Sequence, residues 1–189
     1  MNRHELVGSS KVLGSSMFKR TGWWMLCLLV IGMIAAPLAS AQVQVPKSGK
    51  FSVHYGWKAI YPTMQDLGAG ATLFIGEVHG AGFNDAGSGI MHSSAITCPS
   101  TGIAHAKGSD FRGNCVITDA DGDNIFLNWD CAGPAKGPGP QEGRCAGTET
   151  IWGGTGKYEG IIGKAEFHGG QIGKSSHGYS VWKGEYRIP

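Results

Sequence analysis

Residues 151–163 read Ile-Trp-Gly-Gly-Thr-Gly-Lys-Tyr-Glu-Gly-Ile-Ile-Gly and predict a sharp turn between two β-strands. Five glycines stand where a strand must turn and restart, and only glycine enters positive φ without a steric penalty. The glycine-rich stretches of the chain do not lie between a strand and a helix, as a phosphate-binding loop would. The stretch therefore indicates strands and turns rather than a nucleotide site.

Short candidate strands lie on both sides of this turn, and none of the longer segments has an apolar period of 3.6 residues. Turn sequences at 84–87, 106–108 and 121–123 separate them. In one strand Ile125, Leu127 and Trp129 alternate with more polar positions, as expected when one face is buried. The candidate strands are 51–61, 71–83, 88–98, 110–118, 124–131, 144–152, 163–170 and 176–188.

Short strands joined by hairpins favour an all-β fold, either a sandwich or an up-and-down barrel. Eight strands suit closure, which removes exposed strand edges, and glycines within strands allow the bends of a tight barrel. We therefore expect a single eight-stranded antiparallel up-and-down β-barrel formed by residues 42–189. Barrels of this size are either filled by side chains or hold one small ligand, and the sequence leaves both alternatives open.

The first 41 residues predict an N-terminal extension and a secretory signal peptide. Lys19 and Arg20 precede an apolar run at 23–34, and Ala-Ser-Ala at 39–41 matches a cleavage site. Met17 is an alternative start to Met1, and an uncleaved membrane anchor is the alternative to cleavage. Export predicts a periplasmic or secreted protein.

Charge argues against polyanionic partners. The chain carries a formal net charge of +2, and removal of residues 1–41, with their excess of three positive charges, leaves −1. Because the remaining cations are scattered, we expect no nucleic-acid partner and no membrane partner after cleavage of the signal.

Four cysteines remain after residue 41, an even number that predicts two disulfides in an oxidising compartment. Sequence order allows three pairings. Hairpin symmetry favours Cys98 with Cys115 and Cys131 with Cys145, because opposed residues of antiparallel strands lie within disulfide reach. A zinc site of four thiolates is disfavoured, since no C-x-x-C spacing occurs.

Residues 119–124, Asp-Ala-Asp-Gly-Asp-Asn, resemble half of a calcium loop. However, the glycine is fourth rather than sixth and no Glu stands at the twelfth position, so a hairpin turn is the expected structure. The histidines are dispersed singly, and we predict no metal site.

Glu77 and His79 are the candidate catalytic residues. They lie two apart on a predicted strand, in one row with Leu73 and Ile75. A carboxylate and an imidazole inside an apolar lumen could exchange protons with a ligand. If the row faces solvent instead, the pair is only a polar surface.

Aromatic side chains on predicted strands supply a candidate ligand pocket, and we expect Phe74, Trp129 and Trp152 to bind the ligand. The alternative for these rings is an ordinary aromatic core.

Residues 147–167, where Gly-Thr-Glu-Thr-Ile-Trp precedes GGTGKYEGIIGKAEF, resemble the bacterial barrels related to allene oxide cyclases and dirigent proteins. The resemblance implies an eight-stranded barrel whose apolar cavity positions an unsaturated fatty-acid epoxide, with no metal or organic cofactor. The shared residues lie in a turn and its strands, so no catalytic position carries over.

The function expected from these observations is the binding of a small apolar or amphipathic molecule in the lumen. A cofactor-independent cyclase or isomerase is the first alternative, and a structural or interaction module with a filled barrel is the second. Related barrels often associate through their outer faces, so a homo-oligomer is a further alternative that the sequence leaves open.

Overall fold

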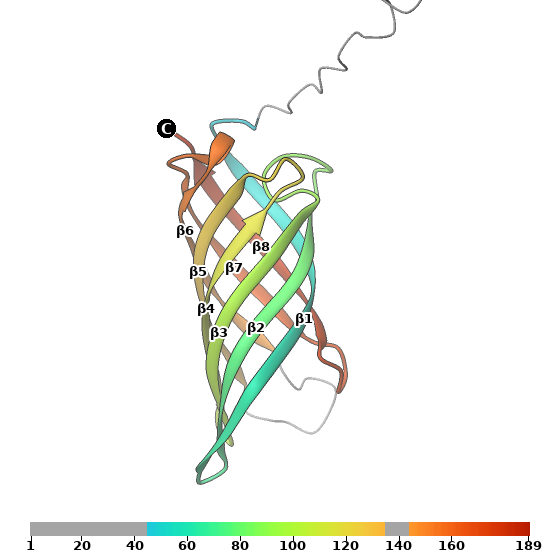
Figure 1. Ribbon diagram of the computed structural model, residues 1–189, viewed down its shortest axis with the longest axis vertical. Coiled ribbons are helices and arrows are strands. Elements are labelled where there is room, and N and C mark those ends of the chain that lie inside the picture. The colour runs from blue at the N-terminus through green and yellow to red at the C-terminus, as the bar shows by residue number, and fades with distance from the viewer. Residues whose placement is uncertain (1–44, 135–143) are drawn as a thin grey trace, which may run out of the picture. The chain divides into compact units, whose positions relative to one another are not determined.

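The computed structural model describes residues 45–134 and 144–189, which form one closed barrel of eight antiparallel strands in chain order (Figure 1). The predicted fold class is confirmed. The predicted signal peptide lies outside the described residues. The strands are β1 (Ser48–Gly68), β2 (Ala71–Asn84), β3 (Ser94–His105), β4 (Gly108–Thr118), β5 (Asn124–Pro134), β6 (Cys145–Gly154), β7 (Ile162–Gln171) and β8 (His177–Arg187).

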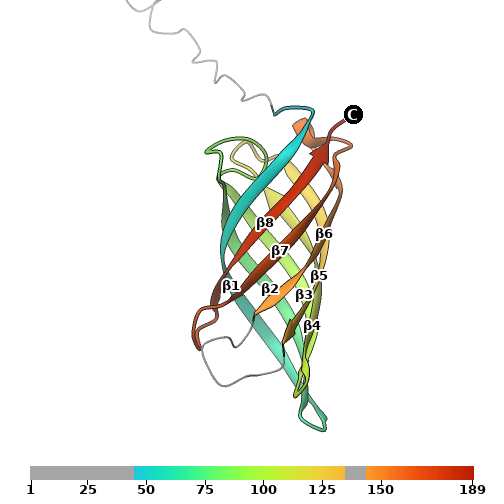
Figure 2. The same cartoon turned by 180° about the vertical axis from the view of Figure 1, so that it is seen from behind.

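Closure is made by the first and last strands, which lie side by side in Figure 2. Val53 of β1 is opposite Asn84 of β2 on one side and Trp182 of β8 on the other. Because β1 is hydrogen-bonded along both edges, the sheet has an inner and an outer face, and successive residues alternate between them.

All eight observed strands overlap those predicted, but the third is displaced toward the C-terminus. The prediction was 88–98, and β3 covers Ser94–His105. Residues before it form a loop in which Met91 and Ser93 have positive φ, of 60° and 49°. Ile90 and Met91, which suggested a strand, are instead buried in the core, each 1% exposed. Apolar residues in a capping loop therefore resembled a strand in sequence.

At the end of the barrel that carries the loop before β3, the inward residues form a filled hydrophobic core. It combines residues of the strands with Ile90 and Met91 of the loop and with Tyr158 and Ile161 of the glycine-rich turn. The strand residues that fill this end are Val53, Ile117, Ile125, Leu127 and Ile151, each at most 2% exposed.

The glycine-rich turn after β6 is held against the acidic hairpin between β4 and β5. Gly156 has a φ of 56°, and a Cβ at this position would collide with the carboxylate of Asp123. The next residue, Lys157, is 19% exposed and places its ammonium against Asp119, Asp121 and Asp123. The expected hairpin turn at 119–124 is present, and its carboxylates hold a lysine of the same chain.

Both predicted cysteine pairs are confirmed as disulfides. Cys98 and Cys115 are directly opposed in the register of β3 and β4, with their Cα atoms 4.1 Å apart. The Cα atoms of Cys131 and Cys145 are 5.6 Å apart. These two are not directly opposed, because Cys131 faces Gly147 across β5 and β6 and the pair is therefore diagonal.

We predict that replacing the ammonium that joins the two turns will destabilise the barrel. Lys157→Met should lower the free energy of unfolding by about 2 kcal/mol, because two carboxylates then lose a charged hydrogen-bonding partner and a third loses a nearby positive charge in a partly buried position. Denaturant unfolding at neutral pH measures this change. Lys164→Met is the matched control, since the ion pair of Lys164 with Glu185 is exposed.

The effect should also depend on pH. Burial opposes ionisation of Asp119, but hydrogen bonds, with that from Lys157 the largest, lower its pKa below 3.8. Its contribution is therefore present above pH 3.8 and is lost as pH falls through the lowered folded-state pKa. Equal unfolding free energies for the two variants at neutral pH would contradict this role of Lys157.

Candidate functional site

A cavity of about 240 Å³ occupies the part of the lumen that the core does not fill. All eight strands contribute to its walls, and it lies toward the end of the barrel where β1 and β2 are joined. Ser109, Arg144, Gln171 and Ser176 lie around its mouth. The barrel thus has one filled end and one hollow end.

The floor of the cavity is the level at which the inward residues change from lining to core. Tyr55 lines the cavity and Val53 belongs to the core, and the same change occurs in β5 between Trp129 and Leu127. In β6 the innermost lining residue is Glu149, and Ile151 follows it in the core. Glu149 therefore lies at the floor.

Aromatic side chains form most of the wall near the floor. Trp129 and Phe167 meet edge to face, with ring centroids 6.0 Å apart, and Tyr55 packs on Trp182 with centroids 4.3 Å apart. Trp57 completes this group of lining rings. The result is a small apolar chamber that suits a flat or compact organic group.

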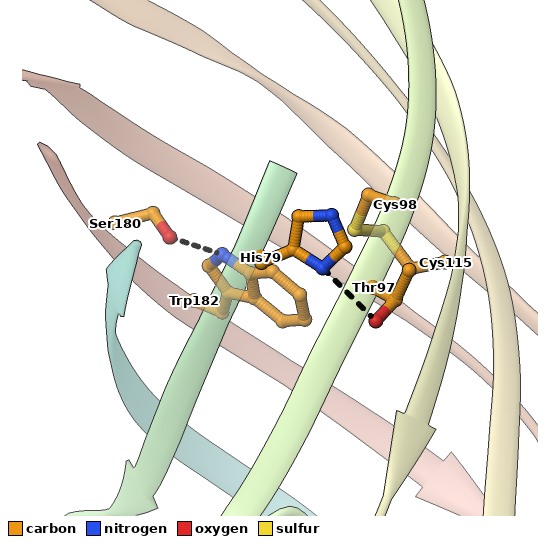
Figure 3. The surroundings of a disulfide bond; sticks show 6 residues. All are labelled: His79, Thr97, Cys98, Cys115, Ser180 and Trp182. Carbon is orange, nitrogen blue, oxygen red and sulfur yellow. Dashed lines mark hydrogen bonds between the residues drawn. A yellow bond between two sulfur atoms is a disulfide. The ribbon is translucent and has the colours of Figure 1, made fainter. Parts of the chain in front are cut away.

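Two of these rings, Trp182 and Tyr55, have polar atoms that are already bonded within the protein. Trp182 Nε1 donates a hydrogen bond to Ser180 Oγ at 2.9 Å, as Figure 3 shows beside the Cys98–Cys115 disulfide, which also lines the cavity. The hydroxyl of Tyr55 bonds to Ser94 Oγ at 3.2 Å. The indole of Trp182 and the phenol of Tyr55 therefore do not depend on a ligand for these bonds.

Glu149 differs from these groups. Its side chain is buried, with 2% of the residue exposed, and Oε2 has no hydrogen-bond partner in the described parts of the chain. Burial raises the pKa of its carboxyl well above 4.5, so the protonated form is favoured. A buried polar atom without a partner is rare in folded proteins and is a candidate functional group.

Glu77 and His79 lie on the outer face of β2, and the prediction that they face the lumen is wrong. Their side chains are 51% and 41% exposed, and His79 Nε2 lies 2.8 Å from Glu77 Oε2. The other ring nitrogen of His79 is 3.4 Å from Thr97 Oγ1 (Figure 3). The physical reason is the alternation of β2, which turns Val78 inward and its neighbours outward. Neither side chain reaches the cavity.

The three predicted aromatic residues are placed differently from one another. Trp129 lines the cavity, and its contact with a ligand stays a prediction. Phe74 packs against Tyr61 and Phe111, two lining residues near the mouth, with centroids 5.7 and 5.9 Å away, but does not itself line the cavity. Trp152 is 58% exposed and stacks on Phe126 with centroids 5.2 Å apart, so its predicted place in the pocket is wrong.

Sequence reasoning missed Glu149, although a signal for it existed. Cys131 belongs to the inward row of β5 that includes Trp129, and the predicted disulfide therefore places Cys145 on the inner face. Counting in twos from Cys145 brings Glu149 and Ile151 inward and leaves Trp152 outside.

Comparisons with protein-family models, with curated proteins and with solved structures found no match. The resemblance to allene oxide cyclase-related barrels therefore stays a prediction. Within residues 45–134 and 144–189, no cluster of three or more His, Cys, Asp or Glu side chains is arranged to hold a metal ion. Over the same residues, no helix is long and apolar enough to cross a membrane.

We predict that Glu149→Gln will stabilise the barrel increasingly as pH rises. The folded-state pKa of Glu149 is raised above the unfolded value near 4.5, so its contribution is fully present below pH 4.5 and is lost above it. Relative to the variant, the wild type should lose about 1.4 kcal/mol per pH unit until the folded-state pKa is reached.

Thermal unfolding of both proteins over a pH series measures this difference. Glu166→Gln, on the exposed outer face of β7, is the control and should follow the wild type at every pH. A difference between wild type and Glu149→Gln that does not change with pH would contradict the burial of an uncompensated carboxyl.

Proposed function

We propose that this chain is an exported β-barrel that binds a small apolar or amphipathic molecule in its lumen. The observation that carries the proposal is the aromatic cavity of about 240 Å³ with the unpartnered Glu149 at its floor. Pockets for drug-sized ligands measure about 300–1,000 Å³, so the ligand is expected to be smaller. An apolar body would contact the rings while one polar group meets the carboxyl.

The cavity also favours binding over a purely structural role. A filled barrel would gain stability by continuing the apolar core to the mouth, since close packing and satisfied polar groups both stabilise a fold. Here the core ends at Leu127 and Ile151, and the next inward residue of β6 is a carboxylic acid. An acid that no group of the described chain pairs costs stability, which the polar group of a ligand in the chamber could restore.

Export is part of the proposal. The two disulfides favour an oxidising compartment, and the expected signal peptide at residues 1–41 leads to a periplasmic or secreted protein. Disulfides facing the cavity brace four neighbouring strands, β3 with β4 and β5 with β6, around the hollow end of the barrel.

Blocking the lumen should abolish binding. Native mass spectrometry of the protein purified from its own host should detect a copurified small molecule in the wild type. Ala59 lines the cavity, so Ala59→Trp fills it and should lower the bound fraction at least about tenfold, a change of about 1.4 kcal/mol.

Lys58→Trp adds the same ring to the exposed outer face of β1 and is the matched control. Retention of the copurified molecule by Ala59→Trp, or its loss from Lys58→Trp alone, would place the binding site outside the lumen. Protein that is empty and binds no apolar probe would support the structural module instead.

A cofactor-independent cyclase or isomerase is the second candidate, and one observation favours it. A carboxyl kept protonated by burial in an apolar chamber can donate its proton to a substrate oxygen and take it back as the product forms. Glu149 would hold that role in place of Glu77 and His79. The aromatic walls would fix the reactive conformer of the substrate.

The enzyme hypothesis predicts turnover of an unsaturated fatty-acid epoxide, the substrate class that the resemblance implies, with a chain short enough for the cavity. Wild-type protein should convert the epoxide faster than buffer, and Glu149→Gln should lower the rate by about 10²–10⁴-fold, because the amide cannot transfer a proton. Product analysis by mass spectrometry measures both. Equal rates for wild type and Glu149→Gln would remove Glu149 from the reaction.

A further inference from the structure

The carboxyl of Glu149 has no positive partner near it in the described chain. Arg144 is the only Lys or Arg side chain that lines the cavity within residues 45–134 and 144–189, and it lies at the exposed mouth. Burial is the cause of the raised pKa of Glu149, and no positive group offsets it. The negative form of this group is therefore uncompensated at the floor.

The walls around the same point are aromatic rings rather than aliphatic chains. Trp129 lies directly opposite Glu149 in the register of β5 and β6 and lines the cavity with Phe167 and Trp182. The faces of aromatic rings carry partial negative charge and attract cations, most strongly in a site shielded from water. The aromatic rings and the carboxylate of Glu149 therefore both favour a positively charged group in a ligand.

We propose that the lumen is a site for a small organic cation, a primary amine with an apolar body, and that Glu149 is its counter-ion. The inference rests on the proposed binding function and names the class of ligand. The ammonium would sit at the floor against the carboxylate, and the apolar body would extend along the rings toward the mouth.

A neutral ligand that accepts a hydrogen bond is the competing class. A protonated Glu149 could donate one bond to an ether or carbonyl oxygen, but a serine or amide could do the same at a smaller cost of burial. An ammonium instead supplies hydrogen-bond donors and a positive charge, and the carboxylate has neither kind of partner in the described chain. The aromatic rings attract the ammonium as well. The arrangement therefore favours the cation.

Binding of the cation changes the proton count. An amine that enters as the ammonium pairs with ionised Glu149, and the proton of the acid form passes to water. The affinity of the protein for the amine should therefore rise by about tenfold per pH unit until Glu149 is ionised in the free protein. Affinity for a neutral acceptor should be unchanged or fall over the same range, because that ligand needs the acid form.

Few other groups can contribute to this pH dependence. The titratable or charged side chains that line the cavity with Glu149 in the described residues are Tyr55, Tyr61, Tyr179 and Arg144. Burial raises the pKa of Tyr55 and of Tyr61, so both phenols stay neutral from about pH 5 to about pH 9. The guanidinium of Arg144 stays charged throughout.

Three probes of matched shape test the proposal: 3-phenylpropylamine, 3-phenylpropan-1-ol and 3-phenylpropanoate. Quenching of tryptophan fluorescence reports binding, because Trp57, Trp129 and Trp182 line the cavity. The amine should bind at least about tenfold more tightly than the alcohol at neutral pH, with an affinity that rises with pH. Glu149→Gln should reduce the affinity for the amine to about that for the alcohol, and Glu166→Gln should change neither affinity.

The outcomes separate this inference from the proposed function. If the alcohol or the carboxylate binds as tightly as the amine, and Ala59→Trp blocks that binding, the lumen is a binding site and the cation inference is overturned. The same conclusion follows if Glu149→Gln binds the amine like the wild type. If none of the three probes quenches fluorescence at millimolar concentration and the purified protein is empty, the proposed function fails as well.

Discussion

Hydrogen bonding between β1 and β8 is the constraint on which the rest of the structure depends. It joins the two ends of the sheet and leaves each strand with one face toward the lumen. From then on the position of every side chain follows from its parity along the strand. The same constraint that buries Glu149 and Trp129 keeps Glu77 and His79 in solvent.

Within that frame the apolar residues are unevenly distributed along the barrel. The end that carries the glycine-rich turn is packed by strand residues and by Ile90 and Met91 of the preceding loop, whereas the other end is hollow. Glu149 lies at the boundary between the two regions, where it is desolvated by the core yet adjoins free space. The raised pKa of its carboxyl is therefore a product of position along the barrel rather than of a neighbouring charge.

Local features of the sequence predicted the strands, the turns and both cysteine pairs, because hairpins are determined by nearby residues. Which side chains of β2 and β6 point into the lumen was not predictable from the sequences of those two strands alone. In β2 both rows are apolar, with Leu73 and Ile75 in one and Phe74 and Val78 in the other. The loop before β3 also resembled a strand, and the volume of the cavity depends on side chains from eight strands together.

The ammonium of Lys157, which reaches from the glycine-rich turn to the acidic hairpin, takes the place that a dissolved cation could hold. Closely spaced aspartates repel one another, and in calcium-binding loops a divalent ion offsets that repulsion. Here Lys157 supplies the offsetting charge through the covalent chain. This counter-charge at the packed end of the barrel is covalently held, and chelating agents or ion-poor media leave it in place.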